Sequence, residues 1–192
     1  MDYEVTTDPG AFPGQTRLDR GVLDAVVRHR VRWLDVVARV VTEIGGFWVL
    51  TAVVIVCAIV WRRRVGDWTG SVVLVTVGLA ASWLTSLLKA GFERPRPPID
   101  LRLTQAGGYA LPSGHSLQSA AIWGTVAVLV ASQVPRALRR RAWSAAAAMA
   151  FAVGLSRIYL GVHWTTDVLA GWAIGAVLVA VAGVAMRSRS RR

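Results

Sequence analysis

The sequence has little charge and few of the residues that small extracellular domains depend on. Only 17% of its 192 residues are charged and 54% are hydrophobic, whereas ordinary soluble domains carry about 25% charged residues. It contains one cysteine, Cys57, which excludes an intrachain disulfide framework. The low charge and a mean hydropathy of +0.48 also exclude a disordered chain. They indicate a protein whose apolar surface meets lipid.

Lysine is nearly absent, because 21 of the 22 basic residues are arginine and Lys89 is the one lysine. A net charge of +11 would suit a nucleic-acid-binding protein, but the distribution of the charge argues against that function. Eleven basic residues fall in three short clusters separated by long apolar runs, at 62–64, 136–141 and 187–192. This pattern is typical of the cytoplasmic segments of a membrane protein. We therefore expect a bilayer, and no nucleic acid, as a partner.

Five apolar runs are long enough to cross a membrane as helices. A hydrocarbon core of about 30 Å needs roughly 20 helical residues, and the runs cover 44–61, 70–88, 116–134, 142–160 and 166–186. A helix satisfies its own backbone hydrogen bonds, as lipid requires. The sequence therefore predicts an all-α fold, a polytopic transmembrane helix bundle of five spans.

Residues 21–43 have the pattern of an amphipathic helix. Apolar residues including Leu23, Val27 and Val31 recur at helical spacing, with charged residues on the opposite side. Burying those charges in lipid would cost roughly 2.5 to 3.5 kcal/mol each, so we expect this helix to lie on the membrane surface. We interpret residues 1–20 as a flexible N-terminal tail and residues 187–192 as a basic cytoplasmic tail.

The arginine clusters also orient the bundle. If the first run passes from outside to inside, all three clusters lie in the cytoplasm, as the positive-inside rule requires. The C-terminus is then cytoplasmic, and segments 89–115 and 161–165 are extracytoplasmic. We predict a multi-pass protein of the cell membrane with these two segments on its outer face.

The two extracytoplasmic segments and the run ends beside them hold residues suited to binding phosphate. Arginine presents a planar fork to phosphate oxygens and lysine presents a point charge. Segment 112–115 opens the third run, where backbone N–H groups and the helix dipole favour an anion. The predicted phosphate cradle combines local amides with the side chains of Lys89, Arg96, Ser113 and Arg157. The other loop charges, Glu93, Arg94, Asp100 and Arg102, are interpreted as solvated.

Two histidines in this region could share the chemistry of phosphoryl transfer. Asp167 follows His163 by four residues, so it shares a helix face with the imidazole and can hold it in one tautomer. We predict that His163 attacks phosphorus and that His115 protonates the departing oxygen. Carboxylates are too few for a two-metal site, and a zinc site would lack a third matching ligand. We therefore predict no metal.

These residues resemble the motifs of the type-2 phosphatidic acid phosphatase superfamily, the lipid phosphate phosphatases. The matching positions are Lys89, Arg96 and Pro97 for the first motif, 112–115 for the second, and Ser156, Arg157, His163 and Asp167 for the third. The resemblance implies an all-helical membrane phosphatase domain over 44–186, a phosphohistidine at His163 oriented by Asp167, and no metal or other cofactor. It also implies phosphate binding by Lys89, Arg96, Ser113, Gly114 and Arg157.

A site at the outer lipid boundary favours a substrate whose hydrophobic tail stays in the bilayer. Phosphatidic acid, phosphatidylglycerol phosphate and a polyprenyl diphosphate such as undecaprenyl diphosphate all fit this description. Two alternatives are a lipid phosphotransferase that uses the same histidine, and a non-catalytic membrane scaffold that keeps the motif. Vanadium-dependent haloperoxidases share the motifs by resemblance, but they are soluble.

The number of spans and the oligomeric state are less well defined by the sequence. Membrane members of the family often have six spans, one more than the five predicted here, so the position of the N-terminus is open. Gly171 and Gly175 are spaced for a close helix contact, either within one chain or between two chains.

Overall fold

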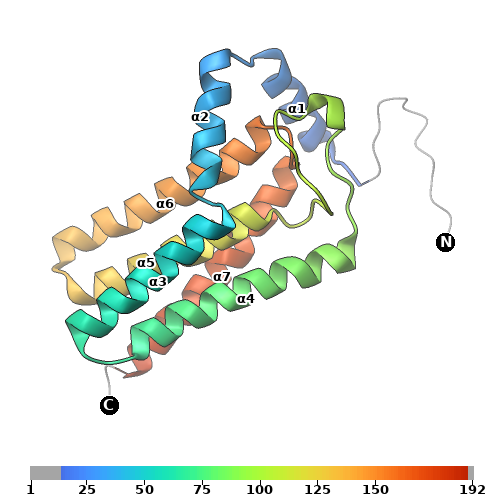
Figure 1. Cartoon of the computed structure of the whole chain (residues 1–192). Helices are drawn as coiled ribbons and strands as arrows, with labels where there is room; N and C mark the ends of the chain where they lie inside the picture. Colours follow the sequence, from blue (N-terminus) through green and yellow to red (C-terminus); the bar gives the residue numbers. More distant parts are fainter. Residues whose placement is uncertain (1–13, 190–192) are drawn as a thin grey trace.

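The computed structural model describes residues 14–189, and every regular element in that range is helical (Figure 1). The elements in order are α1 (Arg17–Arg28), α2 (Arg32–Glu43), α3 (Phe47–Val65), α4 (Thr69–Phe92), the 3-10 turn η1 (Ile99–Leu101), α5 (Gly114–Gln133), α6 (Arg136–Tyr159) and α7 (Thr165–Arg189). The predicted all-α class is therefore confirmed for the described residues.

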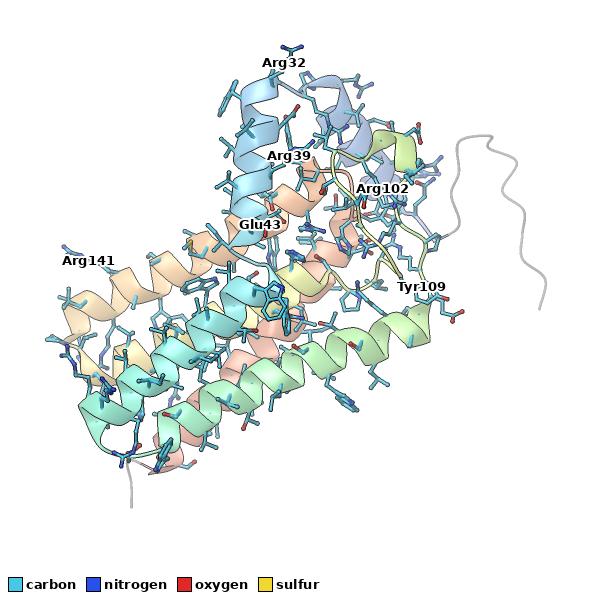
Figure 2. The ribbon with its side chains drawn as sticks, viewed as in Figure 1. Arg32, Arg39, Glu43, Arg102, Tyr109 and Arg141 are labelled. Atoms are coloured by element: carbon cyan, nitrogen blue, oxygen red, sulfur yellow. The ribbon has the colours of Figure 1, made fainter. Side chains whose placement is uncertain are left out.

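Helices α3 to α7 form a bundle with α5 at its centre, packed against α7, α6, α4 and α3. Figure 1 shows these five long helices side by side. Because α4 to α7 alternate in direction, α4 and α6 finish, and α5 and α7 begin, at the end that carries the 93–113 loop, here called the loop end. At the opposite end lie the arginine clusters at 62–64 and 136–141, as the labelled Arg141 shows (Figure 2).

The bundle buries small apolar clusters and leaves other apolar side chains on its outer surface. One cluster joins Leu50, Leu74 and Ile122, and a second joins residues of α4, α5 and α7 that include Leu117. By contrast, large apolar side chains such as Leu79, 68% exposed, face outward from the helices. A helix that is apolar on its outer as well as its inner face is typical of a membrane environment.

Membrane crossing is supported for part of the predicted set. Among the described helices, α4 and α7 are each long and apolar enough to span a bilayer. Helices α2 and α3, which meet at a 45° bend, would add a third span if they act as one. At least two candidate spans are thus present, and the full count of five stays a prediction.

Two glycines of α7 bring that helix against the backbone of α5. A β-carbon at Gly171 would lie 2.8 Å from the carbonyl oxygen of Ser113, and one at Gly175 would lie 2.7 Å from Cβ of Ala120. The spacing of the two glycines therefore produces a close contact within the chain. The contact also sets the register at the loop end, where the backbone N–H of Ser113 donates to the carbonyl of Asp167 at 3.0 Å.

The N-terminal region differs from the prediction of one helix over 21–43. Two helices, α1 and α2, occupy this region and are separated by a break at residues 29–31. The break is bound to the end of α6: the Arg30 guanidinium donates to the carbonyl of Tyr159 at 3.1 Å, and the Val31 N–H donates to the Tyr159 hydroxyl at 3.2 Å. Contacts with a distant part of the chain thus accompany an interruption that no proline or glycine marks.

Helix α1 also begins earlier than expected, inside the segment 1–20 interpreted as a flexible tail. A capping box fixes its start, because the Thr16 hydroxyl accepts from the N–H of Asp19 while the Asp19 carboxylate accepts from the N–H of Thr16. Residues 14–20 are therefore part of the folded structure. The rest of that predicted tail, 1–13, and residues 190–192 of the predicted basic tail lie outside the described residues.

Replacement of Gly175 by alanine should weaken the α5–α7 contact, because the added methyl group meets Ala120 and the backbone of Leu117. Overpacking of this kind costs about 1–3 kcal/mol, so we expect a lower unfolding temperature in detergent. Gly183→Ala is the matched control on the same helix, since a β-carbon there has no neighbour within 4 Å. Equal unfolding temperatures for the two variants would contradict the close contact.

Candidate active site

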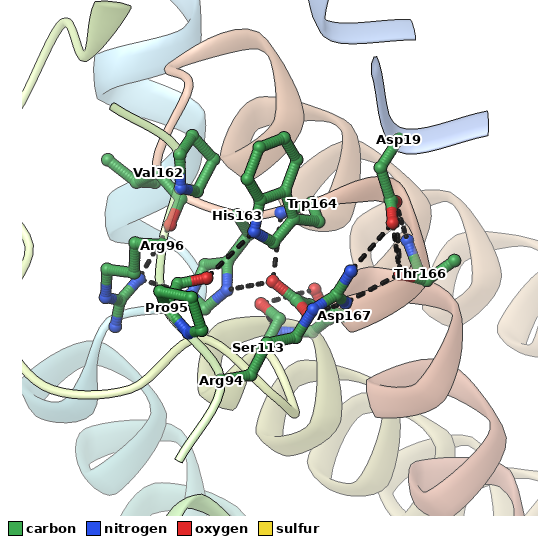
Figure 3. Close-up of polar contacts among 12 residues, drawn as sticks. Asp19, Arg94, Pro95, Arg96, Ser113, Val162, His163, Trp164, Thr166 and Asp167 are labelled. Atoms are coloured by element: carbon green, nitrogen blue, oxygen red, sulfur yellow. Dashed lines mark hydrogen bonds and ion pairs between the residues drawn. The ribbon is translucent and has the colours of Figure 1, made fainter. Parts of the chain in front are cut away.

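The imidazole of His163 lies between a carboxylate and a guanidinium at the loop end (Figure 3). His163 is 3% exposed; its Nδ1 lies 3.3 Å from Oδ2 of Asp167, and its Nε2 lies 3.0 Å from Nη1 of Arg96. An arginine side chain can only donate hydrogen bonds, so Nε2 must be the acceptor. The ring proton is therefore on Nδ1, which donates to Asp167, and the lone pair is on Nε2.

The surroundings of His163 keep its ring neutral. Burial lowers the pKa of His163 well below its ordinary value of 6.5, and the nearby positive charges, led by Arg96 and Arg157, lower it further. Burial also lowers the pKa of Arg96 to about 10, which leaves this guanidinium charged at neutral pH. A neutral imidazole with its lone pair on Nε2 is the nucleophilic form.

The turn that carries His163 is held in place by the 93–113 loop. Gly161 adopts a φ of +67°, and a β-carbon there would lie 2.6 Å from the carbonyl oxygen of Leu101. The N–H of Leu103 donates to the carbonyl of Leu160 at 2.9 Å, and the buried indole of Trp164 donates to the carbonyl of Pro95 at 2.9 Å. These contacts fix the position of the turn before α7 begins.

Arg96 binds the same turn and the loop together. Besides its contact with His163, its guanidinium donates to the carbonyls of Val162 at 2.7 Å, Gly107 at 2.9 Å and Gly108 at 2.9 Å. Arg96, one of the predicted phosphate-binding residues, is thus held with its Nη1 beside the Nε2 lone pair of His163. Its positive charge therefore lies beside Nε2 of His163.

The other predicted cations and the second histidine gather at the same end from three different helices. Lys89 comes from the last turn of α4, Arg157 from the last turn of α6 and His115 from the first turn of α5. Each of the three acts electrostatically on His163, and both cations act on His115. Arg157 is buried, and its Nε has no hydrogen-bond partner among the residues that the structure describes. That buried donor is suited to an anionic ligand.

Ser113 and Gly114 hold the start of α5 in this region. Ser113 is fully buried and its hydroxyl accepts from the N–H of Ser116 at 3.5 Å and from the Ser116 hydroxyl at 2.9 Å, so its own proton stays available to donate. A β-carbon at Gly114 would lie 3.0 Å from Cγ2 of Thr85, so this glycine allows α4 to approach. All eight predicted site residues therefore gather at the loop end.

Two residues of this region were not expected from the sequence. Arg94, interpreted as a solvated loop charge, is 8% exposed and forms ion pairs with the carboxylates of Asp167 and Asp19. Asp19 itself is 1% exposed and comes from α1. The spacing of Thr16 and Asp19 could have indicated the helix start, but no local signal pairs Asp19 with a residue 75 positions away. Within residues 14–189, no group of three or more His, Cys, Asp or Glu side chains could hold a metal ion.

Comparison with protein families decides the relationship of this chain to known proteins. Residues 70–191 match the family model described as the PAP2 superfamily. The chain belongs to the PAP2 superfamily. The resemblance seen in the sequence motifs is thereby confirmed, and this PAP2 protein carries them at the loop end of its helix bundle.

Two relatives of this PAP2 protein have names that describe phosphatases. Phosphatidylglycerophosphatase B of Bacillus subtilis is 32% identical to it over 163 residues, which cover 83% of this chain and 79% of the relative. An undecaprenyl-diphosphatase of Sulfolobus acidocaldarius is 31% identical over 105 residues, which cover 54% of this chain and 46% of that relative.

Solved structures share the fold of this PAP2 protein. The crystal structure of a transmembrane PAP2-type phosphatidylglycerolphosphate phosphatase from Bacillus subtilis aligns with a TM-score of 0.81 and 28% identity, covering 85% of this chain and 82% of that one. Aquifex aeolicus LpxE shares the fold at 23% identity, with a TM-score of 0.72 and coverage of 90% and 98%.

The effect of Arg96 on His163 can be measured directly. Because the positive charge of Arg96 lowers the pKa of His163, Arg96→Gln should raise that pKa toward 6.5. The measurement is a ¹⁵N-histidine NMR titration in detergent, simplified by the presence of only three histidines. Arg39→Gln, at an exposed position of α2, is the control. A titration of His163 that is the same in both variants would rule out the electrostatic role of Arg96.

Proposed function

We propose that this PAP2 protein hydrolyses the terminal phosphoryl group of a membrane lipid through a phosphohistidine at His163, without a metal ion. The family and the relative named as a phosphatidylglycerophosphatase together support a lipid phosphate phosphatase, and the mechanism is the proposal. The observation that carries it is the state of His163: buried and neutral, with its lone pair on Nε2 and with its Nδ1–H donating to Asp167. Positive charges around the ring suit a phosphate dianion.

In the first step, Nε2 of His163 attacks phosphorus as the bond from phosphorus to the lipid oxygen breaks. In the free site, burial and the positive charges of Arg157 and Lys89 lower the pKa of His115 to about 3, so His115 gains its proton together with the substrate, whose negative charge offsets those cations. His115 then gives this proton to the leaving oxygen, so the lipid leaves as an alcohol, or as a lipid monophosphate when the substrate is a diphosphate. His163 becomes a positively charged phosphohistidine, and the carboxylate of Asp167 stabilises this charge through the Nδ1 proton. Lys89, Arg96 and Arg157 offset the negative charge on the phosphoryl oxygens.

In the second step, water attacks the phosphohistidine from the side that the leaving group has vacated. The now neutral His115 accepts a proton from the water, the bond from phosphorus to Nε2 breaks, and inorganic phosphate leaves. Both histidines then hold the protons with which they began. The site therefore needs a proton donor and acceptor beside the nucleophile, which His115 of α5 supplies in this proposal.

The position of the site in the bundle favours a lipid substrate. Lys89 lies in the last turn of α4 and Asp167 in the first turn of α7. One candidate span therefore finishes at the site and the other begins there. A phosphate bound there can keep its hydrophobic tail in the bilayer. Because the relative with the greater coverage is named as a phosphatidylglycerophosphatase, we propose phosphatidylglycerol phosphate as the first candidate, ahead of undecaprenyl diphosphate and phosphatidic acid.

The same arrangement supports an extracytoplasmic site. The arginines at 62–64 close α3, and those at 136–141 open α6, both at the end of the bundle opposite His163. With those clusters in the cytoplasm, the site faces outward and the C-terminus is inside. This orientation and the five spans, 44–61 to 166–186, are part of the proposal.

The roles of the two histidines can be separated by the leaving group. His163→Ala should abolish phosphate release from all substrates, because it removes the nucleophile. His115→Ala should lower kcat/KM for lipid phosphates by about 10²- to 10⁴-fold but lower kcat/KM for p-nitrophenyl phosphate far less, since nitrophenolate leaves without a proton and kcat/KM reports the first step, not the hydrolysis of the phosphohistidine that all substrates share. The measurement is phosphate release by purified protein in detergent from phosphatidylglycerol phosphate, undecaprenyl diphosphate, phosphatidic acid and p-nitrophenyl phosphate.

Three outcomes of this assay would contradict the proposal. Activity retained in His163→Ala would show that His163 is not the nucleophile. An equal loss of kcat/KM on lipid and nitrophenyl substrates in His115→Ala would show that His115 is not the general acid. Full inhibition by a chelator such as EDTA, reversed by a divalent cation, would contradict the proposed independence of metal. Acid-labile phosphate that can be trapped on wild-type protein, and is missing from His163→Ala, would support the intermediate.

Topology is tested independently of catalysis. A reporter fused after Arg192 should be cytoplasmic, and a tag inserted at Gly107, an exposed position of the 93–113 loop, should be accessible from outside intact cells. Alkaline phosphatase and fluorescent-protein fusions report the two locations with opposite signals. Reversal of both signals would mean that the site faces the cytoplasm.

A further inference from the structure

The N-terminal helix pair α1–α2 lies outside the part of the chain that matches the family model, residues 70–191. Figure 1 nevertheless shows it covering the loop end, beside the start of α7 and the end of α6. We propose that this pair completes the active site, with Asp19 of α1 positioning Asp167 through Arg94, and Thr42 of α2 positioning Arg157. The inference rests on the proposed function and adds two residues to its machinery.

Asp19 is buried against the start of α7. One carboxylate oxygen accepts from the N–H of Thr166 at 2.9 Å, and the other accepts from Nη2 of Arg94 at 2.7 Å (Figure 3). Burial alone would raise the pKa of Asp19, but hydrogen bonds from Thr166, Thr16 and Arg94 lower it below its usual value. Asp19 is therefore a carboxylate at neutral pH, and it faces Arg94.

Arg94 transmits this contact to the catalytic pair. Its Nη1 donates to Oδ1 of Asp167, while the other oxygen of Asp167 accepts from His163 and from the N–H of Trp164. The guanidinium therefore fixes the rotation of the Asp167 carboxylate and directs one oxygen to Nδ1 of His163. If Arg94 were bound only to Asp167, its positive charge would cancel the negative charge of Asp167. Because Asp19 also binds Arg94, the two carboxylates and one guanidinium together carry one net negative charge, which can stabilise an imidazolium at His163.

Thr42 makes the corresponding contact for the phosphate-binding arginine. Its hydroxyl oxygen accepts from Nη1 of Arg157 at 2.8 Å, and both residues are buried. This bond holds one edge of the guanidinium, while the buried Nε has no partner among the described residues. Helix α2 is anchored by Ala38 against Leu160 and Val162. The α2 helix thus fixes a cation that must meet the phosphate in one orientation.

Asp19→Asn tests the first contact in the full-length protein, assayed with phosphatidylglycerol phosphate in detergent. We expect kcat to fall about 10- to 100-fold, as for residues that orient a reacting group through a partner, with KM changed by less than about threefold. Asp24→Asn is the matched control, because Asp24 is exposed on the same helix. Phosphoenzyme formation in rapid quench should slow by the same factor as kcat.

A double-mutant cycle distinguishes positioning through Arg94 from a structural role of Asp19. If Asp19 acts through Arg94, adding Asp19→Asn to Arg94→Gln should lower kcat little further, whereas independent effects would multiply. Should Asp19→Asn fail to fold, Arg94→Lys decides, because it keeps the positive charge but lacks the two nitrogens with which Arg94 bridges Asp19 and Asp167. A kcat at the wild-type level in the testable variant overturns the role of Asp19.

Thr42→Val and Thr42→Ser test the second contact. Valine has the shape of threonine without the acceptor, so we expect KM for the lipid and the inhibition constant of inorganic phosphate to rise about 10-fold. Serine keeps the acceptor and should restore both. A Thr42→Val protein with wild-type values, or a Thr42→Ser protein as impaired as Thr42→Val, overturns the role of Thr42.

Different results would overturn the proposed function and the positioning role of Asp19. If wild-type protein releases no phosphate, or His163→Ala stays active, the proposed function is wrong. If wild type is active and His163→Ala is not, but Asp19→Asn behaves like Asp24→Asn, the function stands and the positioning role is wrong. Unfolding temperatures measured for every variant identify losses of activity caused by unfolding.

Discussion

The carboxylate of Asp167 is the group on which the loop end depends. It is fully buried, and its two oxygens accept from Arg94, His163 and the N–H of Trp164, while its own carbonyl accepts from the N–H of Ser113. An isolated carboxylate in such a place would be very costly, so its donors are required for the structure. Since they come from different segments, this one residue brings together α5, α7 and the 93–113 loop.

The close helix contact explains why these donors meet. Gly171 and Gly175 let α7 lie against the backbone of α5, and this brings the N–H of Ser113 to the first turn of α7. The same register places His115 at the level of His163, although 48 residues separate them in the sequence. Small residues at a helix interface thus determine the geometry of the candidate site. In a membrane, where apolar surface gives little drive for helices to associate, such packing carries much of the specificity.

The sequence could predict contacts between residues that are close in the chain, but not contacts between distant residues. The pairing of His163 with Asp167 is visible because four residues are one helical turn, and the helices are visible as apolar runs. The ion pair of Arg94 with Asp19 is invisible, because it joins residues 75 positions apart and a loop arginine normally lies in water. The break between α1 and α2 is invisible for the same reason, since its partner, Tyr159, lies in α6. The start of α1 could have been predicted, because Thr16 and Asp19 have the spacing of a capping box.

The distribution of charge at the loop end explains why a second buried acid is useful. Lys89, Arg96 and Arg157 leave the site with an excess of positive charge, which a phosphate dianion can neutralise. In the proposed mechanism, that same excess opposes the positive charge that forms on His163 when its nitrogen bonds to phosphorus. A local negative charge on the Nδ1 side of the ring is needed to offset it, and Arg94 would cancel the charge of Asp167 if it had no other partner. Asp19 supplies that partner from α1, so the N-terminal helix separates a cationic face for phosphate from an anionic face for the imidazole.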